Sequence, residues 1–148
     1  MKKIIHFLHI KAPPSKVFWA LTTQEGLAGW WSTDLKVEGG LGAVIHFHFV
    51  ADFNPDMEVT ALEEDRLIRW KCIGGHDNWL EDTFSFELRP SAGATDLMFE
   101  QVYAQELSDK IYGNYNFNWG YYLGSLKELC ETGIGKPYPA ARAGNGRP

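Results

Sequence analysis

His46 and His48 place two imidazoles at a spacing of two, so that both lie on one face of a predicted strand. Two such side chains can share a metal ion, but a catalytic zinc site needs three protein ligands. No partner for a third position is evident in the sequence. The alternation also puts the pair opposite Phe47 and Phe49, outside an apolar interior. We therefore interpret both residues as solvated strand histidines and predict no metal and no cofactor.

Two other groups could support catalysis. His76 and Asp77 follow a glycine pair and could act as a base and its orienting carboxylate, although adjacency in sequence does not establish that geometry. Cys72 and Cys130 both fall on predicted inner faces, and neither has a base beside it in the sequence. Two buried, inert thiols are favoured over a nucleophile. We assign no catalytic residue.

The aromatic content is the unusual feature: 148 residues include six Trp, six Tyr and nine Phe. Such side chains can form an ordinary core or line a cavity, and composition does not decide between them. Gln101 is the most informative polar residue among them, because an unpaired amide on an inner face costs roughly 1–3 kcal/mol. It needs a ligand, a water or a Tyr hydroxyl. The candidate ligand-binding residues are Trp30, Trp31, Phe47, Phe49, Trp70, Phe84, Phe86, Phe99, Gln101, Tyr103, Tyr115, Trp119 and Tyr122, with Gln101 and the three tyrosines as polar groups.

The elements that position these residues follow from periodicity and turn signals. A capping-box spacing at Thr22 and Glu25 predicts the start of a second short helix. The last helix carries one apolar stripe and ends at Gly133. The expected order is a strand over 4–11, short helices over 15–22 and up to 30–31, strands over 34–38, 43–51, 57–62, 66–73, 81–89 and 96–103, and a helix from about 114 to 132.

This order indicates an α+β fold. One helix covers a band about 10–12 Å wide, whereas six or seven strands span roughly 30 Å. The antiparallel sheet must therefore curve around the C-terminal helix, and we expect gaps beside the helix that are walled by aromatic side chains.

Composition narrows the class of protein. The length fits a single domain over residues 1–138, followed by a flexible tail over 139–148. An apolar fraction of 45% excludes disorder, and a net charge of −5 with no basic cluster argues against nucleic acid as a partner. No stretch is long enough for membrane insertion, and no cleavage site follows the N-terminal apolar run. A cytoplasmic location is expected.

Gly120 and Gly124 are costly inside a helix, at about 1 kcal/mol each. They lie roughly opposite the apolar stripe, near Phe117 and Tyr121. A smooth surface of this kind suggests that a loop or another subunit packs there, and a homodimer contact is favoured.

Several segments together resemble the START-like helix-grip superfamily (SRPBCC), and more specifically the branch named after activator homologues of the heat shock protein 90 ATPase. The resemblance covers nearly the whole chain up to Tyr138. It implies a curved sheet gripping the C-terminal helix around an internal apolar cavity, but no single activity. The eukaryotic activators carry an additional N-terminal chaperone-binding domain, for which we see no room here. The matching segments are 10–22, 27–31, 119–127 and 133–138, including the pair Trp30-Trp31 and the run Gly133-Ile134-Gly135-Lys136-Pro137-Tyr138.

Three functions follow from the residues and the resemblance. The leading one is binding of a small hydrophobic or aromatic ligand, such as a lipid, between sheet and helix, without catalytic machinery. The first alternative is a cyclase- or hydrolase-type enzyme, which predicts a strongly perturbed pKa inside the cavity. The second alternative is a chaperone-associated or stress-response interaction protein.

Overall fold

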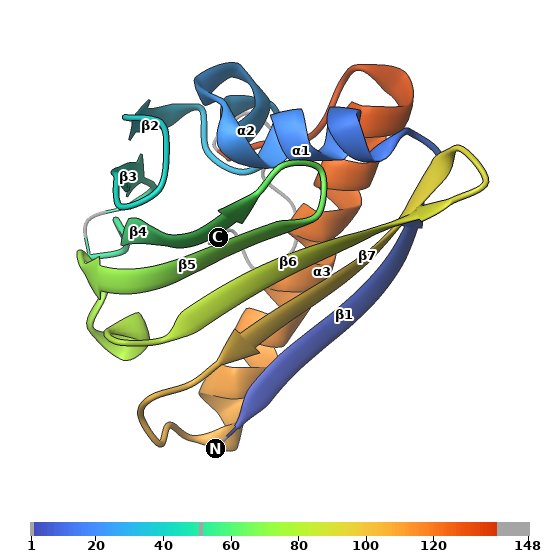
Figure 1. Cartoon of the computed structure of the whole chain (residues 1–148). Coiled ribbons are helices and arrows are strands. Elements are labelled where there is room, and N and C mark those ends of the chain that lie inside the picture. The colour runs from blue at the N-terminus through green and yellow to red at the C-terminus, as the bar shows by residue number, and fades with distance from the viewer. Residues whose placement is uncertain (1, 51, 139–148) are drawn as a thin grey trace.

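The computed structural model describes residues 2–50 and 52–138. These residues form a seven-stranded antiparallel sheet in the order β1-β7-β6-β5-β4-β3-β2, with a long C-terminal helix and two short helices after the first strand. Figure 1 shows α3 crossing one face of the curved sheet, while α1 and α2 lie over one end of it. The predicted α+β helix-grip fold is confirmed. The elements are β1 (Lys3–Ile10), α1 (Pro14–Thr22), α2 (Gln24–Trp30), β2 (Asp34–Val37), β3 (Val44–His48), β4 (Asp56–Glu63), β5 (Leu67–Gly74), the 3-10 helix η1 (Asp77–Trp79), β6 (Thr83–Ser91), β7 (Ala94–Val102) and α3 (Asp109–Thr132).

The sheet register aligns its apolar side chains on the face toward α3. Trp70 on β5 lies opposite Phe84 on β6, which lies opposite Gln101 on β7. Because alternate residues share a face, the next inward row contains Phe86 opposite Phe99. The predicted inner faces of these central strands are confirmed.

The two short helices carry the tryptophan pair into the interior. Pro14 occupies the first turn of α1, where its missing N–H costs nothing. The cap of α2 is Thr23, whose Oγ1 accepts a hydrogen bond from Gly26 N at 2.9 Å. The prediction that Thr22 caps this helix is wrong, because the Thr22 hydroxyl donates to Phe18 O instead.

Helix α3 begins five residues earlier than predicted. The Ser108 side chain accepts a hydrogen bond from Ile111 N, and Asp109 places a negative charge in the first turn. The helix ends at Gly133, whose φ of 90° is the left-handed conformation expected of a C-terminal glycine. Strand β3 is shorter than predicted, since Phe49 N bonds the Asn54 side chain and the chain turns between Val50 and Phe53.

The segment 134–138, which we call the strap, returns across the tryptophan-bearing end of α2. Ser125 Oγ donates to Trp30 O at 2.9 Å and accepts from Lys136 N at 2.6 Å. Tyr138 N donates to Trp31 O at 2.8 Å. The strap therefore fixes α2 against α3, and the predicted tail over 139–148 lies outside the described residues.

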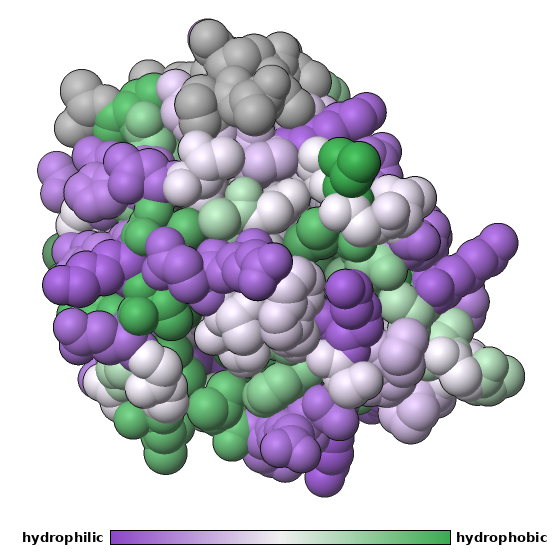
Figure 2. Space-filling model, turned by 90° about the horizontal axis from the view of Figure 1, so that it is seen from above, coloured by the Kyte–Doolittle hydropathy of each residue, from purple (hydrophilic) through white to green (hydrophobic). Residues whose placement is uncertain are grey.

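Figure 2 looks onto the end of the molecule that carries α1 and α2, and hydrophobic and hydrophilic residues are interspersed on that face. Within residues 2–50 and 52–138, no helix is long and apolar enough to cross a membrane.

Candidate functional site

The thirteen candidate ligand-binding residues all occur in the interior between the sheet, α2 and α3. Twelve of them are buried, and Phe49 is partly buried against the same core. The structure thus brings together side chains from four strands, α2 and α3. Tyr103 lies apart from the main cluster of rings, in edge contact with Tyr112 at a centroid distance of 4.7 Å.

Trp31 is the centre of this aromatic cluster. It follows α2 directly and is 1% exposed. Its ring is stacked on or set at an angle to six others, which is the geometry in which aromatic pairs add stability beyond their buried area. The centroid distances are 4.5 Å to Phe47, 5.0 Å to Phe49, 5.1 Å to Trp119, 5.7 Å to Trp30, 6.0 Å to Trp70 and 6.3 Å to Trp79.

The expected gaps beside α3 are nearly filled. A hollow of about 10 Å³ is lined by six side chains from α3, from η1 and from the residue that follows α2. A second hollow of about 20 Å³ lies beside Trp70, near Leu21 and Ile45. Each is close to the space of a single water molecule. The expectation of ligand-sized gaps needs this correction: side chains from loops occupy the space that the sheet and helix alone would leave. The first hollow is lined by Trp31, Trp79, Tyr115, Asn118, Trp119 and Tyr122.

Trp79 and Phe53 are the loop residues that our sequence analysis missed. Both are at most 2% exposed, and their rings meet at 4.9 Å. No periodicity locates a loop residue, although a Trp beside a glycine-rich polar loop is a signal that this side chain must be buried somewhere. Asn118 was also missed, and its position between Tyr115 and Tyr122 on the helical stripe could have revealed it.

Asp82 is a buried carboxyl group in this interior that we did not predict. It has the same strand parity as Phe84, Phe86 and Leu88, which was a signal for an inward side chain. Its Oδ1 accepts from Ala104 N at 2.7 Å, and its Oδ2 accepts from Gln101 Nε2 at 3.0 Å. Burial raises its pKa to about 6, and these two hydrogen bonds only partly offset the effect.

Gln101 links this carboxyl group to helix α3. Its Oε1 accepts from Trp119 Nε1 at 2.8 Å, while its Nε2 donates to Asp82. The amide is therefore satisfied by Asp82 and Trp119, rather than by the ligand, water or Tyr hydroxyl that we expected. This connection fixes β7 against α3 and against the residue that precedes β6.

The Tyr103 hydroxyl lies near the same carboxylate. Burial and the charge of Asp82 raise the pKa of Tyr103 well above its usual value, and the nearby Trp79 indole lowers it only in part. Neither the Tyr103 hydroxyl nor Trp79 Nε1 has a partner in hydrogen-bond geometry within the described part of the chain. Asp82 and Tyr103 line neither of the two interior hollows, but Tyr103 borders a separate surface hollow of about 500 Å³ beside Lys2 and Tyr112.

His76 and Asp77, which could have acted as a base and its orienting carboxylate, are not paired in the structure. Its Nε2 lies 2.8 Å from the Tyr115 hydroxyl, and Asn78 Nδ2 donates to the same hydroxyl at 3.2 Å. These contacts join the loop before β6 to helix α3 at the edge of the aromatic cluster.

The other candidates lie outside the cluster or are inert. His46 and His48 point outward, and His46 Nδ1 lies 2.6 Å from Asp56 Oδ1. Among the described residues, no group of three His, Cys, Asp or Glu side chains could hold a metal ion. Burial raises the pKa of the Cys72 thiol to about 11 and that of Cys130 to about 12, which disfavours the reactive thiolate.

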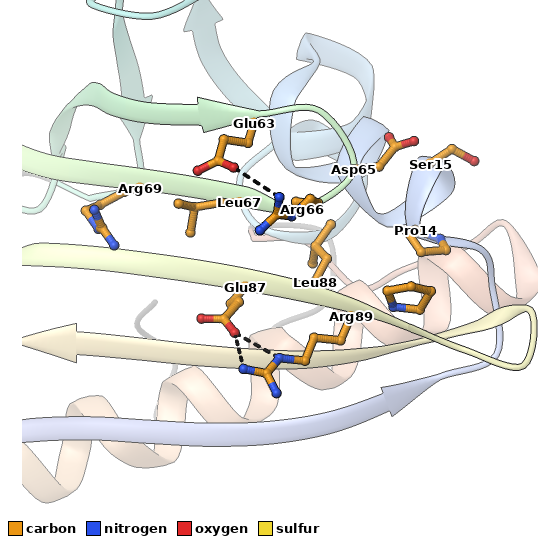
Figure 3. Close-up of a pocket in the computed structure, with 11 residues that line it drawn as sticks. Pro14, Ser15, Glu63, Asp65, Arg66, Leu67, Arg69, Glu87, Leu88 and Arg89 are labelled. Carbon is orange, nitrogen blue, oxygen red and sulfur yellow. Dashed lines mark hydrogen bonds and ion pairs between the residues drawn. The ribbon is translucent and has the colours of Figure 1, made fainter.

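A groove of about 730 Å³ lies on the surface at the end of β4, β5 and β6 beside α1. Figure 3 shows two ion pairs along it, Glu63 with Arg66 at 3.6 Å and Glu87 with Arg89 at 2.8 Å. Both pairs are largely exposed, and exposed pairs contribute little energy. The groove mixes both signs of charge and therefore does not select an anionic or a cationic ligand.

The curved sheet that grips a C-terminal helix over an aromatic interior defines the START-like class of helix-grip proteins. Comparison with known families makes this more specific, because residues 11–131 match the family described as Activator of Hsp90 ATPase homolog 1-like protein. The chain belongs to this family.

Solved structures agree with this assignment. The solution structure of the Aha1 dimer from Colwellia psychrerythraea is 34% identical with a TM-score of 0.81, and the match covers 91% of this chain and 100% of that one. DynU16, a protein of the dynemicin biosynthetic locus, is 22% identical with a TM-score of 0.76, covering 91% of this chain and 49% of that one. A Mesorhizobium loti protein is 22% identical with a TM-score of 0.73, covering 86% and 96%. The latter two show the fold alone. No curated protein sequence matches significantly.

Proposed function

We propose that this protein binds a small hydrophobic or aromatic ligand between its sheet and α3, without a catalytic residue of its own. The observation that carries this proposal is the aromatic cluster around Trp31. Its rings come from the sheet, from α2, from α3 and from the loop before β6, and they contact one another between the sheet and α3. The resemblance to START-like proteins supports the same location.

The ligand is expected to be uncharged. The side chains around the hollow by Trp31 are aromatic except for Asn118, and none of them carries a charge. A charged ligand would lose its hydration without gaining an opposite charge, which is unfavourable. Asn118 is the one amide among these lining residues, and it is 2% exposed.

A thermal-shift panel tests the proposal. The purified protein is heated with fatty acids, flavonoids, polyketides and simple aromatic compounds, and a ligand of the folded state raises the Tm by mass action. We expect at least one uncharged apolar compound to raise the Tm in a concentration-dependent manner. A flat Tm across the whole panel would contradict the proposal.

We also propose that the chain forms a homodimer through the outer face of β1. The 34%-identical Colwellia psychrerythraea structure is described as a dimer. β1 is an edge strand, and its outer face exposes 54% of Ile5 and 65% of Phe7, with Met98 of β7 directly opposite Phe7. A second copy is the occupant that the relative suggests for this apolar surface.

The glycine face of α3 is a weaker place for this contact. A Cβ added at Gly120 would lie 3.5 Å from His6 Cε1, so β1 of the same chain already covers that position. Light scattering coupled to size-exclusion chromatography should give twice the chain's mass for the native protein and a monomer for Phe7→Ser. Leu41→Ser, at an exposed turn residue, is the control and should remain dimeric. A native monomer at all concentrations would overturn this proposal.

A further inference from the structure

Trp79 fills the part of the interior that lies between the hollow and the sheet. Its side chain is 2% exposed, and it reaches the cluster from η1 rather than from a strand or from α3. Its ring is therefore the part of the cluster that a loop movement could withdraw. The centroid distances are 4.9 Å to Phe53, 5.1 Å to Phe84, 5.4 Å to Tyr115, 5.9 Å to Trp119 and 6.3 Å to Trp31.

The segment that carries Trp79, residues 75–81, is bounded by two residues in the left-handed region. Gly75 has φ 78° and Glu81 has φ 72°. We call this segment the Trp79 loop. Its backbone bonds to residues outside the loop are from Asn54 N to Gly75 O, from Glu81 N to Cys72 O, and from Asp82 N to Trp79 O at 2.8 Å.

Between these ends, the Trp79 loop is attached mainly by side-chain contacts. The Tyr115 hydroxyl lies 2.8 Å from His76 Nε2 and accepts from Asn78 Nδ2, and Gln105 Nε2 donates to Asp77 O at 2.6 Å. The His76 ring also stacks on Phe53 at 4.3 Å. Water can replace each of these hydrogen bonds when the loop moves outward, so their loss costs little net free energy.

A surface groove also borders Tyr115. It has a volume of about 850 Å³ and is lined by Asn78 from the Trp79 loop and by Ile111, Asn114 and Phe117 from α3. Tyr115 borders both this groove and the interior hollow. A ligand in the groove is thus separated from the aromatic cluster by Tyr115 and the loop bonded to it.

The closed position leaves the Trp79 indole incompletely satisfied. Trp79 Nε1 is buried near the Tyr103 hydroxyl and lowers the pKa of that group, but within residues 2–50 and 52–138 the two are not in good hydrogen-bond geometry. A poorly bonded buried donor costs free energy, part of which solvation of the indole would recover when the loop opens.

We propose that the ligand is an uncharged, planar, two-ring aromatic compound that takes the place of the Trp79 indole while the Trp79 loop moves away from α3. This inference rests on the proposed ligand-binding function, and it names the class of ligand and the side chain that the ligand displaces. In the ligand-free protein, Trp79 acts as an internal substitute for the ligand. The observed affinity is then the intrinsic affinity reduced by the fraction of chains in the open state.

The test uses indole and 2-naphthol as probes and isothermal titration calorimetry on the full chain. Trp79→Ala removes the internal substitute, and we expect it to bind indole at least tenfold more tightly than the native protein. Tyr115→Phe keeps the ring but removes the bonds to His76 and Asn78, and it should raise affinity roughly three- to tenfold. Thr60→Val is the control, since its hydroxyl donates to Arg69 O within the sheet and contacts neither the Trp79 loop nor Gln105, and it should leave affinity unchanged.

Nuclear magnetic resonance gives a second readout on the native chain. The Trp79 indole N–H signal, assigned by its loss in Trp79→Phe, should begin to exchange with water when the probe is added. Tighter binding by Tyr115→Phe together with this exchange supports the inference.

Other outcomes separate the inference from the function it rests on. If an apolar compound binds the native chain but the Trp79 signal and the Tyr115→Phe affinity do not change, the inference is overturned and the function stands. Binding of indole to Trp79→Ala alone also overturns the inference, because Trp79 then never leaves its position. If neither the native chain nor any variant binds an apolar compound, both proposals fail.

Discussion

Asp82→Asn tests the buried polar connection at the base of the site. The carboxyl pKa is about 6 in the folded protein, against an ordinary value of 3.8. Folding therefore favours the protonated form, and the folded chain holds more protons than the unfolded chain between these two values. The free energy of unfolding must fall as pH rises through this window, by about 3 kcal/mol in total, and then level off.

The asparagine variant lacks this titration but keeps the size and shape of the side chain. It can accept from Ala104 N, but its amide then faces Gln101 Nε2 as a second donor, a mismatch that costs roughly 1–3 kcal/mol at every pH. The constant offset does not affect the test. Relative to the native protein, the variant should gain about 2 kcal/mol of stability between pH 4 and pH 7, which is the part of the total that falls within this range.

Urea unfolding of both proteins at half-unit steps from pH 4 to pH 7 measures the difference. Groups such as Asp109 and Glu131, whose pKa values are lowered by Lys2 and by the Lys11 backbone N–H, act in the opposite direction, but they are common to both proteins and cancel. Parallel stability curves for the two proteins would refute the argument that Asp82 is buried with a raised pKa.

Three further substitutions test the packing. Gly135→Ala should destabilise by a few kcal/mol, because its Cβ would lie 2.3 Å from Gly29 O, and chemical denaturation measures the loss. Gly124→Ala has open space around the added Cβ and should stabilise by up to about 1 kcal/mol, so a destabilised variant with lost dimer mass would instead place Gly124 in the subunit contact. Gln101→Leu removes the donor to Asp82 and should lower the free energy of unfolding by roughly 1–3 kcal/mol at pH 7. The loss should be smaller at pH 4, where the Asp82 carboxyl is protonated. An equal loss at both pH values would contradict the contact between Gln101 and Asp82.

The elements of the fold were predictable because they follow repeating patterns. Alternation placed Phe84, Phe86 and Leu88 on the inner face, and the four-three spacing placed Trp119 on the helix stripe. The early start of α3 was missed although Tyr112, three residues before Tyr115, continues the apolar stripe and Ser108 indicates the cap.

The residues that meet in the site were predictable from the sequence, but the volume of the cavity between them was not. Curvature of the sheet implied space beside α3, yet whether that space is open depends on Trp79 and Phe53, whose loops have no periodicity. Only one side of the hydrogen bond between Gln101 and Asp82 was predicted from the sequence. Gln101 was recognised as a buried amide that needs a partner, whereas Asp82 lies just before β6 and its inward position, shared with Phe84 and Phe86, was not recognised.

The central claim is that a ligand binds between the sheet and α3 at the position of Trp79. A crystal structure with the panel compound that raises the Tm most tests it directly. We expect the compound to lie between Trp31, Tyr115 and Trp119, with the Trp79 ring displaced toward solvent. A compound bound on the outer surface, with the interior rings unmoved, would contradict the claim.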